Sequence, residues 1–169
     1  LVVASGGLSI PRMGATGFGF DLARRFGHAV LPTRAGLVPL TLSGRHAEDY
    51  AELAGIALPV TARCNGAEFS NAMLLTHRGV SGPAILQISS YWQPGDELRL
   101  DLLPGEDALA RLREEQAARP GAELRNVLAD LLPRRFAQRL CERWLGSRPM
   151  RQFDAPALRR SIQLNGIDG

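Results

Sequence analysis

The chain of 169 residues is 45% apolar and 22% charged, the balance of an ordinary globular protein with room for one domain or two small ones. No apolar run approaches the roughly 18 residues that span a bilayer, and no targeting leader opens the chain, so we expect a cytoplasmic protein with no membrane partner. The net charge of +3, carried by 20 arginines and no lysine, is too small to indicate nucleic-acid binding by itself.

The first 35 residues have an α/β pattern. The opening LVVASGG is typical of a buried strand followed by a glycine turn. A helix is predicted after residues 14–17, with Phe18, Leu22 and Phe26 on one face and Thr16 as its cap. Gly27 suits the left-handed position that ends a helix.

Residues 36–104 have mostly β signals. Short apolar runs recur at residues 29–31, 37–42, 56–64, 67–76 and 97–103. Asn65-Gly66 between two such runs indicates a tight hairpin. Two helices are expected in this stretch, at about residues 46–54 and 82–89. The many short strands favour a small β-barrel.

Residues 105–162 have a helical periodicity that predicts four amphipathic helices. In the third, Phe136, Leu140 and Trp144 recur at intervals of four, and Asp154 is the expected cap of the last. Residues 163–169 are expected to begin a returning strand. The predicted fold class is therefore α+β, a small β-barrel joined to an all-α helical subdomain, with α/β stubs at both ends.

No residue spacing indicates a metal site. The two cysteines, Cys64 and Cys141, lie far apart in the sequence, and the three histidines are scattered along it. Zinc and haem sites need closely spaced ligands, so we expect no metal and two reduced thiols.

Two glycine-rich turns are the first candidate site. They contain Ser5, Gly6 and Gly7, and then Gly14, Ala15, Thr16 and Gly17. Glycines at the end of a strand let the backbone N–H groups approach a phosphate or a flavin ring. The same glycines also suit a turn that serves packing alone, and spacing by itself favours that interpretation.

The second candidate site comprises His77, Arg78 and Ser81. Ser81 lies where a helix cap is expected, with Pro83 in the first turn. A helix start beside an arginine and a histidine favours an anion or a substrate carbonyl. The alternative is an ordinary capped helix with His77 bonded to a neighbour.

Two segments together resemble a known family. The segment LVVASGGLSIPRMGATGFGFDLARRFGH and the segment LTHRGVSGPAILQIS are similar to two signatures of the BaiN-like family of bacterial NAD(P)/FAD-dependent oxidoreductases. The resemblance implies an insertion, barrel plus helices, between the halves of a Rossmann-like FAD domain. Residues 1–35 would belong to the FAD domain, 36–104 to the barrel, 105–162 to the helical part and 163–169 to a strand that returns to the FAD domain.

The resemblance also implies an activity. In the intact enzyme a hydride would pass from NAD(P)H through FAD to an acceptor with a polarised double bond. The glycine turns would border the flavin, His77, Arg78 and Ser81 would lie near the substrate, and the insertion would shape substrate access. The remainder of the FAD domain would be the main partner, with a small molecule or RNA as substrate.

Two departures from the family pattern matter. Ser5 stands where threonine is common, which keeps the hydroxyl group. No G-x-G-x-x-G occurs anywhere in the chain, so the pyrophosphate cradle of a dinucleotide site is missing. We therefore expect FAD binding by this chain alone to be weak or absent.

Two rival functions stay open. Arg134, Arg135, Arg139 and Arg143 mark one side of a predicted helix and would suit RNA phosphates, although a solvated helix face has the same pattern. The insertion could also be purely architectural, or serve dimerisation; the sequence does not indicate an oligomeric state.

Overall fold

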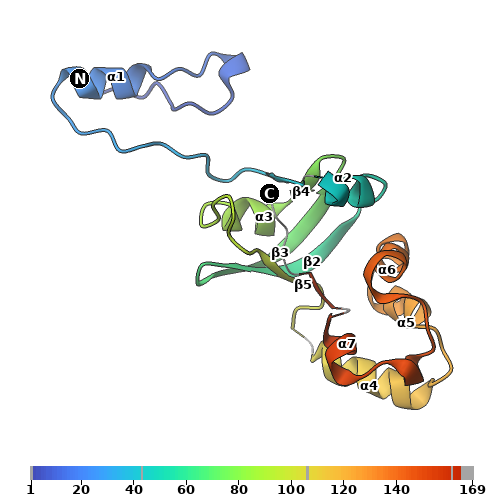
Figure 1. The fold of residues 1–169 in the computed structure, drawn as a ribbon. Helices are drawn as coiled ribbons and strands as arrows, with labels where there is room; N and C mark the ends of the chain where they lie inside the picture. The colour runs from blue at the N-terminus through green and yellow to red at the C-terminus, as the bar shows by residue number, and fades with distance from the viewer. Residues whose placement is uncertain (1, 43, 106, 161, 165–169) are drawn as a thin grey trace. The chain divides into compact units, whose positions relative to one another are not determined.

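The computed structural model describes residues 2–42, 44–105, 107–160 and 162–164, and it divides the chain into two compact units, Leu1–Ala35 and Gly36–Gly169. Figure 1 shows the path of the chain through them. No described helix is both long enough and apolar enough to cross a membrane.

The first unit contains a 3₁₀ turn at Pro11–Met13 and helix α1 at Phe18–Arg25. The predicted helix is confirmed, and Gly27 has the expected left-handed conformation, with φ of 78°. The prediction that Thr16 caps it is wrong, because Gly17 takes the position before the helix and no side chain caps it. The prediction of a buried opening strand is wrong for residues 2–4, which are exposed and outside any strand. A strand is buried and hydrogen-bonded only where other strands pair with it, and no described residue of this unit does so.

The second unit contains one antiparallel sheet of six strands in the order β1-β4-β3-β2-β5-β6. The strands are β1 Leu40–Thr41, β2 Ala57–Cys64, β3 Ala67–Thr76, β4 Gly79–Ser81, β5 Arg99–Asp101 and β6 Gln163–Leu164. The β2–β3 hairpin turns at Asn65 and Gly66, whose φ angles of 47° and 79° are those of the predicted tight turn. Residues 29–31 contain no strand, and the short β4 was not predicted.

Six α-helices and a 3₁₀ helix, Met150–Gln152, are described in the second unit. The α-helices are α2 Gly44–Ala51, α3 Pro83–Ile88, α4 Ala108–Ala118, α5 Leu124–Leu131, α6 Arg134–Leu140 and α7 Ala155–Arg160. A π-helical turn at Cys141–Leu145 continues α6. A carboxylate oxygen of Asp154 accepts a 2.8 Å hydrogen bond from the Ala157 N–H, as predicted for a cap. The side chain of Trp144 lies outside the described residues.

The expected returning strand starts within the sheet. Its described residues, Gln163 and Leu164, pair antiparallel with Asp101 and Leu100 of β5. Residues 165–169 lie outside the described residues. This pairing brings the chain back to the barrel after the helices.

Two groups of apolar side chains form the core. In the sheet, Val60, Ala62 and Met73 are fully buried, as are Ile85 and Ile88 of α3, which packs against β2 and β3 (Figure 1). Among the helices the fully buried apolar side chains are Leu112, Leu124, Val127, Leu128, Phe136, Ala137, Met150 and Leu158. The mixed α+β class, a curled antiparallel sheet joined to helices, is confirmed.

Two glycines let β4 lie between its neighbours. Gly79 has φ of 152°, and a Cβ there would lie 2.2 Å from the Leu40 carbonyl oxygen. Gly82, just after β4, has φ of 94°, and a Cβ there would lie 2.7 Å from the Ala72 carbonyl oxygen. Both close contacts are with backbone, which cannot swing aside as a flexible side chain can.

We predict that Gly79→Ala lowers the free energy of unfolding by about 3 kcal/mol or more, because the added methyl group strains the backbone and separates β1 from β4. Urea unfolding measures the change. Gly121→Ala is the control: that glycine has no positive φ and a Cβ there would meet only the Arg151 side chain at 3.7 Å. A shift of equal size in the two variants would contradict the prediction.

Candidate functional site

The segment before α1 folds back onto the first turns of that helix. A Cβ at Gly19 would lie 3.2 Å from the Ser5 Oγ, and one at Gly17 would lie 3.8 Å from the Leu8 side chain. The glycines of α1 thus admit the segment that contains Ser5. The structure in this way brings two of the predicted flavin-contacting stretches, residues 5–7 and 14–17, into one small unit.

The outer side of these turns is open. A Cβ at Gly6, Gly7 or Gly14 would meet nothing within 4 Å, and Gly6 and Gly14 have φ of 73° and 87°. Open glycine backbone fits the close approach of a flat ring such as that of a flavin. The chain offers no matching cradle for the pyrophosphate, since G-x-G-x-x-G is absent from its sequence.

His77 and Arg78 form the exposed turn between β3 and β4. The Thr76 hydroxyl group fixes this turn: it donates to the Gly79 carbonyl oxygen at 3.0 Å and accepts from the Arg78 N–H at 3.3 Å. The Arg78 carbonyl oxygen accepts a 2.9 Å hydrogen bond from the Leu42 N–H. The backbone is therefore tied on both sides, while both side chains point into solvent-accessible space. Sequence reasoning did not single out Thr76.

Ser81 does not cap a helix, and that part of the sequence prediction is wrong. Ser81 belongs to β4 and pairs with Leu74, and Gly82 takes the position before α3 without a side-chain cap. The chain reverses there through φ of 94°, which glycine adopts without strain and serine does not. Ser81 lies two residue pairs along the strand from the Thr76–Gly79 pair, about 7 Å from the turn that contains His77 and Arg78.

Two of the four arginines proposed for RNA are bound within the molecule. The Arg135 guanidinium donates to the main-chain oxygen of Glu52, and the Arg139 guanidinium forms an ion pair with the Glu52 carboxylate. Arg139 also lies 3.6 Å from Glu142. These contacts join α6 to the end of α2. Glu52 was not predicted, because nothing local in the sequence connects it to residues more than 80 positions away.

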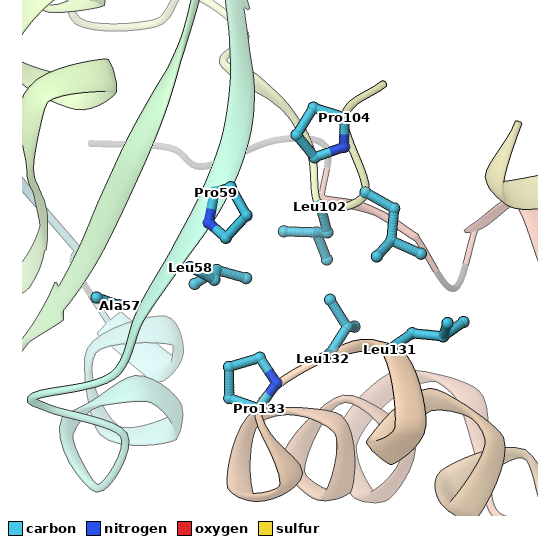
Figure 2. Close-up of a pocket in the computed structure, with 9 residues that line it drawn as sticks. Ala57, Leu58, Pro59, Leu102, Pro104, Leu131, Leu132 and Pro133 are labelled. Carbon is cyan, nitrogen blue, oxygen red and sulfur yellow. The ribbon is translucent and has the colours of Figure 1, made fainter. Parts of the chain in front are cut away.

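An apolar cavity of about 270 Å³ lies where the sheet meets the link between α5 and α6 (Figure 2). Leu58 and Pro59 of β2 line it together with Leu102, Leu132 and Pro133. The proline nitrogens carry no hydrogen, and the aliphatic side chains offer no donor or acceptor. The lining side chains therefore offer no polar group that would orient a substrate.

The remaining titratable groups do not form a catalytic cluster. Burial raises the pKa of the Cys141 thiol to about 11, and it also raises the pKa of the Cys64 thiol. Both thiols are buried and remain protonated near neutral pH, which makes them poor nucleophiles. Among the described residues no three histidine, cysteine or carboxylate side chains are placed to hold a metal ion.

A barrel-like antiparallel sheet followed by short helices defines a recognisable class of domain. Residues 34–163 match the model of the HI0933-like protein barrel and H2TH domain. The chain belongs to this family, and the domain is found in FAD-type oxidoreductases.

Three relatives are informative. The chain is 52% identical over 142 residues to the ribosomal RNA dihydrouridine synthase of Escherichia coli (strain K12), covering 83% of this chain and 35% of that protein. It is 45% identical over 141 residues to the ribosomal RNA dihydrouridine synthase of Haemophilus influenzae (strain ATCC 51907 / DSM 11121 / KW20 / Rd), covering 82% and 34%. It is 28% identical over 157 residues to the 3-dehydro-bile acid delta(4,6)-reductase of Clostridium scindens (strain ATCC 35704 / DSM 5676 / VPI 13733 / 19), covering 84% and 37%.

The chain spans about a third of the length of these curated relatives. The resemblance identified in the sequence is confirmed at the level of the broad flavoprotein family. Its finer assignment is corrected by the identities: the two synthases are much more similar to this chain than the bile acid reductase is.

We predict that Glu52→Gln lowers the free energy of unfolding by up to about 1 kcal/mol at low salt, with a smaller loss at high salt, because Arg139 loses its charged partner. Chemical unfolding at two salt concentrations measures this. Glu97→Gln is the matched control, since it breaks an exposed pair with Arg99, only two residues away. A larger loss in the control would show that the Glu52 contact does not join the two elements.

Proposed function

We propose that this chain is the barrel and helical insertion of a flavin-dependent enzyme that reduces a uridine base in ribosomal RNA. The main support is sequence identity: the chain is 52% and 45% identical to two enzymes named ribosomal RNA dihydrouridine synthase, but only 28% identical to a reductase named for a bile acid. The RNA substrate was one alternative that the sequence left open, and this ordering of relatives favours it.

The reaction adds two hydrogens across the C5=C6 double bond of uracil, one as a hydride and one as a proton. FAD, reduced by NAD(P)H, would supply the hydride when bound. On this proposal Ser5, Gly6 and Gly7, with the turn at residues 14–17, border the flavin ring through open backbone. His77 and Arg78 are our candidates for contact with the uracil carbonyl groups, because their donors are exposed on a turn whose backbone is fixed.

The base must leave its stack before the ring can meet a flavin. An enzyme of this kind therefore has to hold the RNA backbone on both sides of the target while one base is displaced. We propose that the barrel, residues 36–104, and the helices, residues 105–162, provide that grip and limit access to the flavin.

The exposed apolar side chains of the first unit support its assignment to a flavin domain. Its exposed large apolar residues are Val2, Val3, Leu8, Ile10, Met13, Phe18, Phe26 and Leu31. So many in so short a segment are unfavourable in water. We propose that residues 1–35 pack against the remainder of a flavin domain in a longer chain.

In a strain that lacks its own synthase, we expect the full-length enzyme to restore dihydrouridine to ribosomal RNA. Mass spectrometry of the digested RNA measures the nucleoside, and NAD(P)H oxidation with a steroid enone tests the small-molecule alternative. Reduction of the enone without formation of dihydrouridine would overturn the proposal.

We expect His77→Ala combined with Arg78→Ala to lower kcat/KM on RNA by at least about tenfold, equivalent to about 1.4 kcal/mol of transition-state binding. Steady-state kinetics of the full-length enzyme measure the change. A purely architectural insertion predicts unchanged turnover. Arg63→Ala is the control, an exposed arginine that is paired with Glu68 and that the proposal does not place at the base.

We expect the 169-residue chain alone to bind FAD weakly or not at all, because it lacks a pyrophosphate cradle. The visible spectrum of the purified chain, before and after addition of FAD and gel filtration, tests this. A stoichiometric flavin absorbance that stays with the polypeptide would contradict the expectation.

A further inference from the structure

Two loops at the end of the helical part are held together by backbone hydrogen bonds. Residues 119–124 and 147–152, here called the paired loops, are joined at the bridge between Glu123 and Pro149. The Leu124 N–H donates to the Arg148 carbonyl oxygen at 3.1 Å, and the Arg151 N–H donates to the Pro120 carbonyl oxygen at 3.0 Å. The paired loops therefore have the bonding of a small ladder and not that of a loose connection.

The Gln116 side-chain amide and the buried residue Met150 hold the paired loops in place. Gln116 of α4 donates to the carbonyl oxygens of Met150, at 2.6 Å, and of Phe153, at 2.8 Å. Met150 is fully buried, and its N–H donates to the Ala122 carbonyl oxygen at 2.8 Å. Side chains that leave this frame outward thus start from fixed backbone positions.

Basic residues outnumber acidic residues in the segment that contains the second of the paired loops. Residues 143–162 contain five arginines and a single acidic residue, Asp154, whose carboxylate accepts from the Ala157 N–H. In the first of the paired loops, the Glu123 carboxylate forms an ion pair with Arg125 at 2.7 Å. It also accepts a 2.9 Å hydrogen bond from the Ser147 hydroxyl group. The local carboxylates are therefore already occupied.

Arg148 and Arg151 both extend from the second of the paired loops and are exposed. Among the described residues, neither is within ion-pair distance of a carboxylate, in contrast to Arg119, which binds Glu115 and Asp130. The Arg148 guanidinium lies 4.9 Å from the centre of the Phe153 ring, a contact that holds the arginine in place without neutralising it. The Arg148 guanidinium is thus pre-positioned by the Phe153 ring, and both arginines are exposed without an ion pair among the described residues.

We propose that the paired loops are a contact surface for the phosphate backbone of RNA, with Arg148 and Arg151 as its phosphate-binding residues. Arginine binds phosphate through a fixed fork of donors, and a rigid frame reduces the entropy lost on binding. The proposal rests on the RNA substrate of the proposed function. It also moves the RNA contact away from Arg135 and Arg139, which are engaged with Glu52.

The test compares two double variants that remove the same charge. Arg148→Gln with Arg151→Gln removes the proposed contacts, whereas Arg63→Gln with Arg99→Gln removes two exposed arginines that are paired with Glu68 and Glu97. Filter binding of the chain to protein-free ribosomal RNA is measured over a series of salt concentrations. Thermal unfolding of each variant reports whether the fold is intact.

For the first double variant we expect the slope of log K against log salt to fall by about 0.7 to 0.9 for each lost contact, with at least about tenfold weaker binding at low salt. The control should leave the slope unchanged. Arg148→Lys with Arg151→Lys keeps the charge and should keep the slope. Equal losses in the two glutamine variants, or an unchanged slope in the first, would overturn the proposal.

Kinetics of the full-length enzyme separate this proposal from the proposed function. If dihydrouridine forms and the Arg148 and Arg151 variant raises KM with little change in kcat, both stand. If dihydrouridine forms and KM is unchanged, the RNA surface is wrong and the function stands. If no dihydrouridine forms but the difference in salt slope persists, the surface stands and the function is wrong.

Discussion

The approach of three backbones at Gly79 and Gly82 is the constraint on which the sheet depends. A side chain at either glycine would overlap a carbonyl oxygen of a neighbouring strand. This approach lets β4 bond to β1 on one side and to β3 on the other. It also fixes the turn of His77 and Arg78, whose backbone is bonded to Leu42 and Thr76. The position of that candidate site is therefore set by backbone packing, and the functional side chains extend from a frame that does not involve them.

Local patterns were sufficient where the structure is locally determined. Asn65-Gly66 supplies the two positive φ angles of a tight hairpin, and the apolar spacing of α5 and α6 identifies the face of each helix that is buried. The sequence was insufficient where the partner is distant. The three residues of β4 are too few for a periodic signal, and they become a strand only because β1 and β3 lie on either side. The opening apolar run and residues 29–31 show the reverse case, in which a strand-like composition has no strand beside it among the described residues.

The arginines show the same limit for function. Helical spacing identified Arg135 and Arg139 as one polar face, which is the pattern of a solvated helix or of a phosphate-binding one. Their actual partner is Glu52, which directly follows α2. In the sequence, strands β2 to β5 lie between Glu52 and these arginines. Sequence reasoning did not identify Arg148 and Arg151, although acidic residues are scarce between positions 143 and 162. Composition shows such an excess of charge, but only the three-dimensional structure shows which cations are already neutralised.

On the proposed function, the two units of the chain serve two tasks that an RNA-reducing flavoenzyme must combine. Cys64 and Cys141 are buried and their pKa values are raised, which makes both thiols poor nucleophiles. On the proposed function a cofactor supplies the redox chemistry, and the part of the chain suited to border it is the open, glycine-rich first unit. The second unit has instead the bonded frame of the paired loops and a local excess of arginine over acidic residues at positions 143–162. Displacing a base costs a few kcal/mol of stacking and pairing, and contacts to the RNA backbone can offset that cost only if they are formed on a surface that does not yield. A backbone-bonded pair of loops meets this requirement better than four arginines on a helix whose own charges are partly satisfied within the protein.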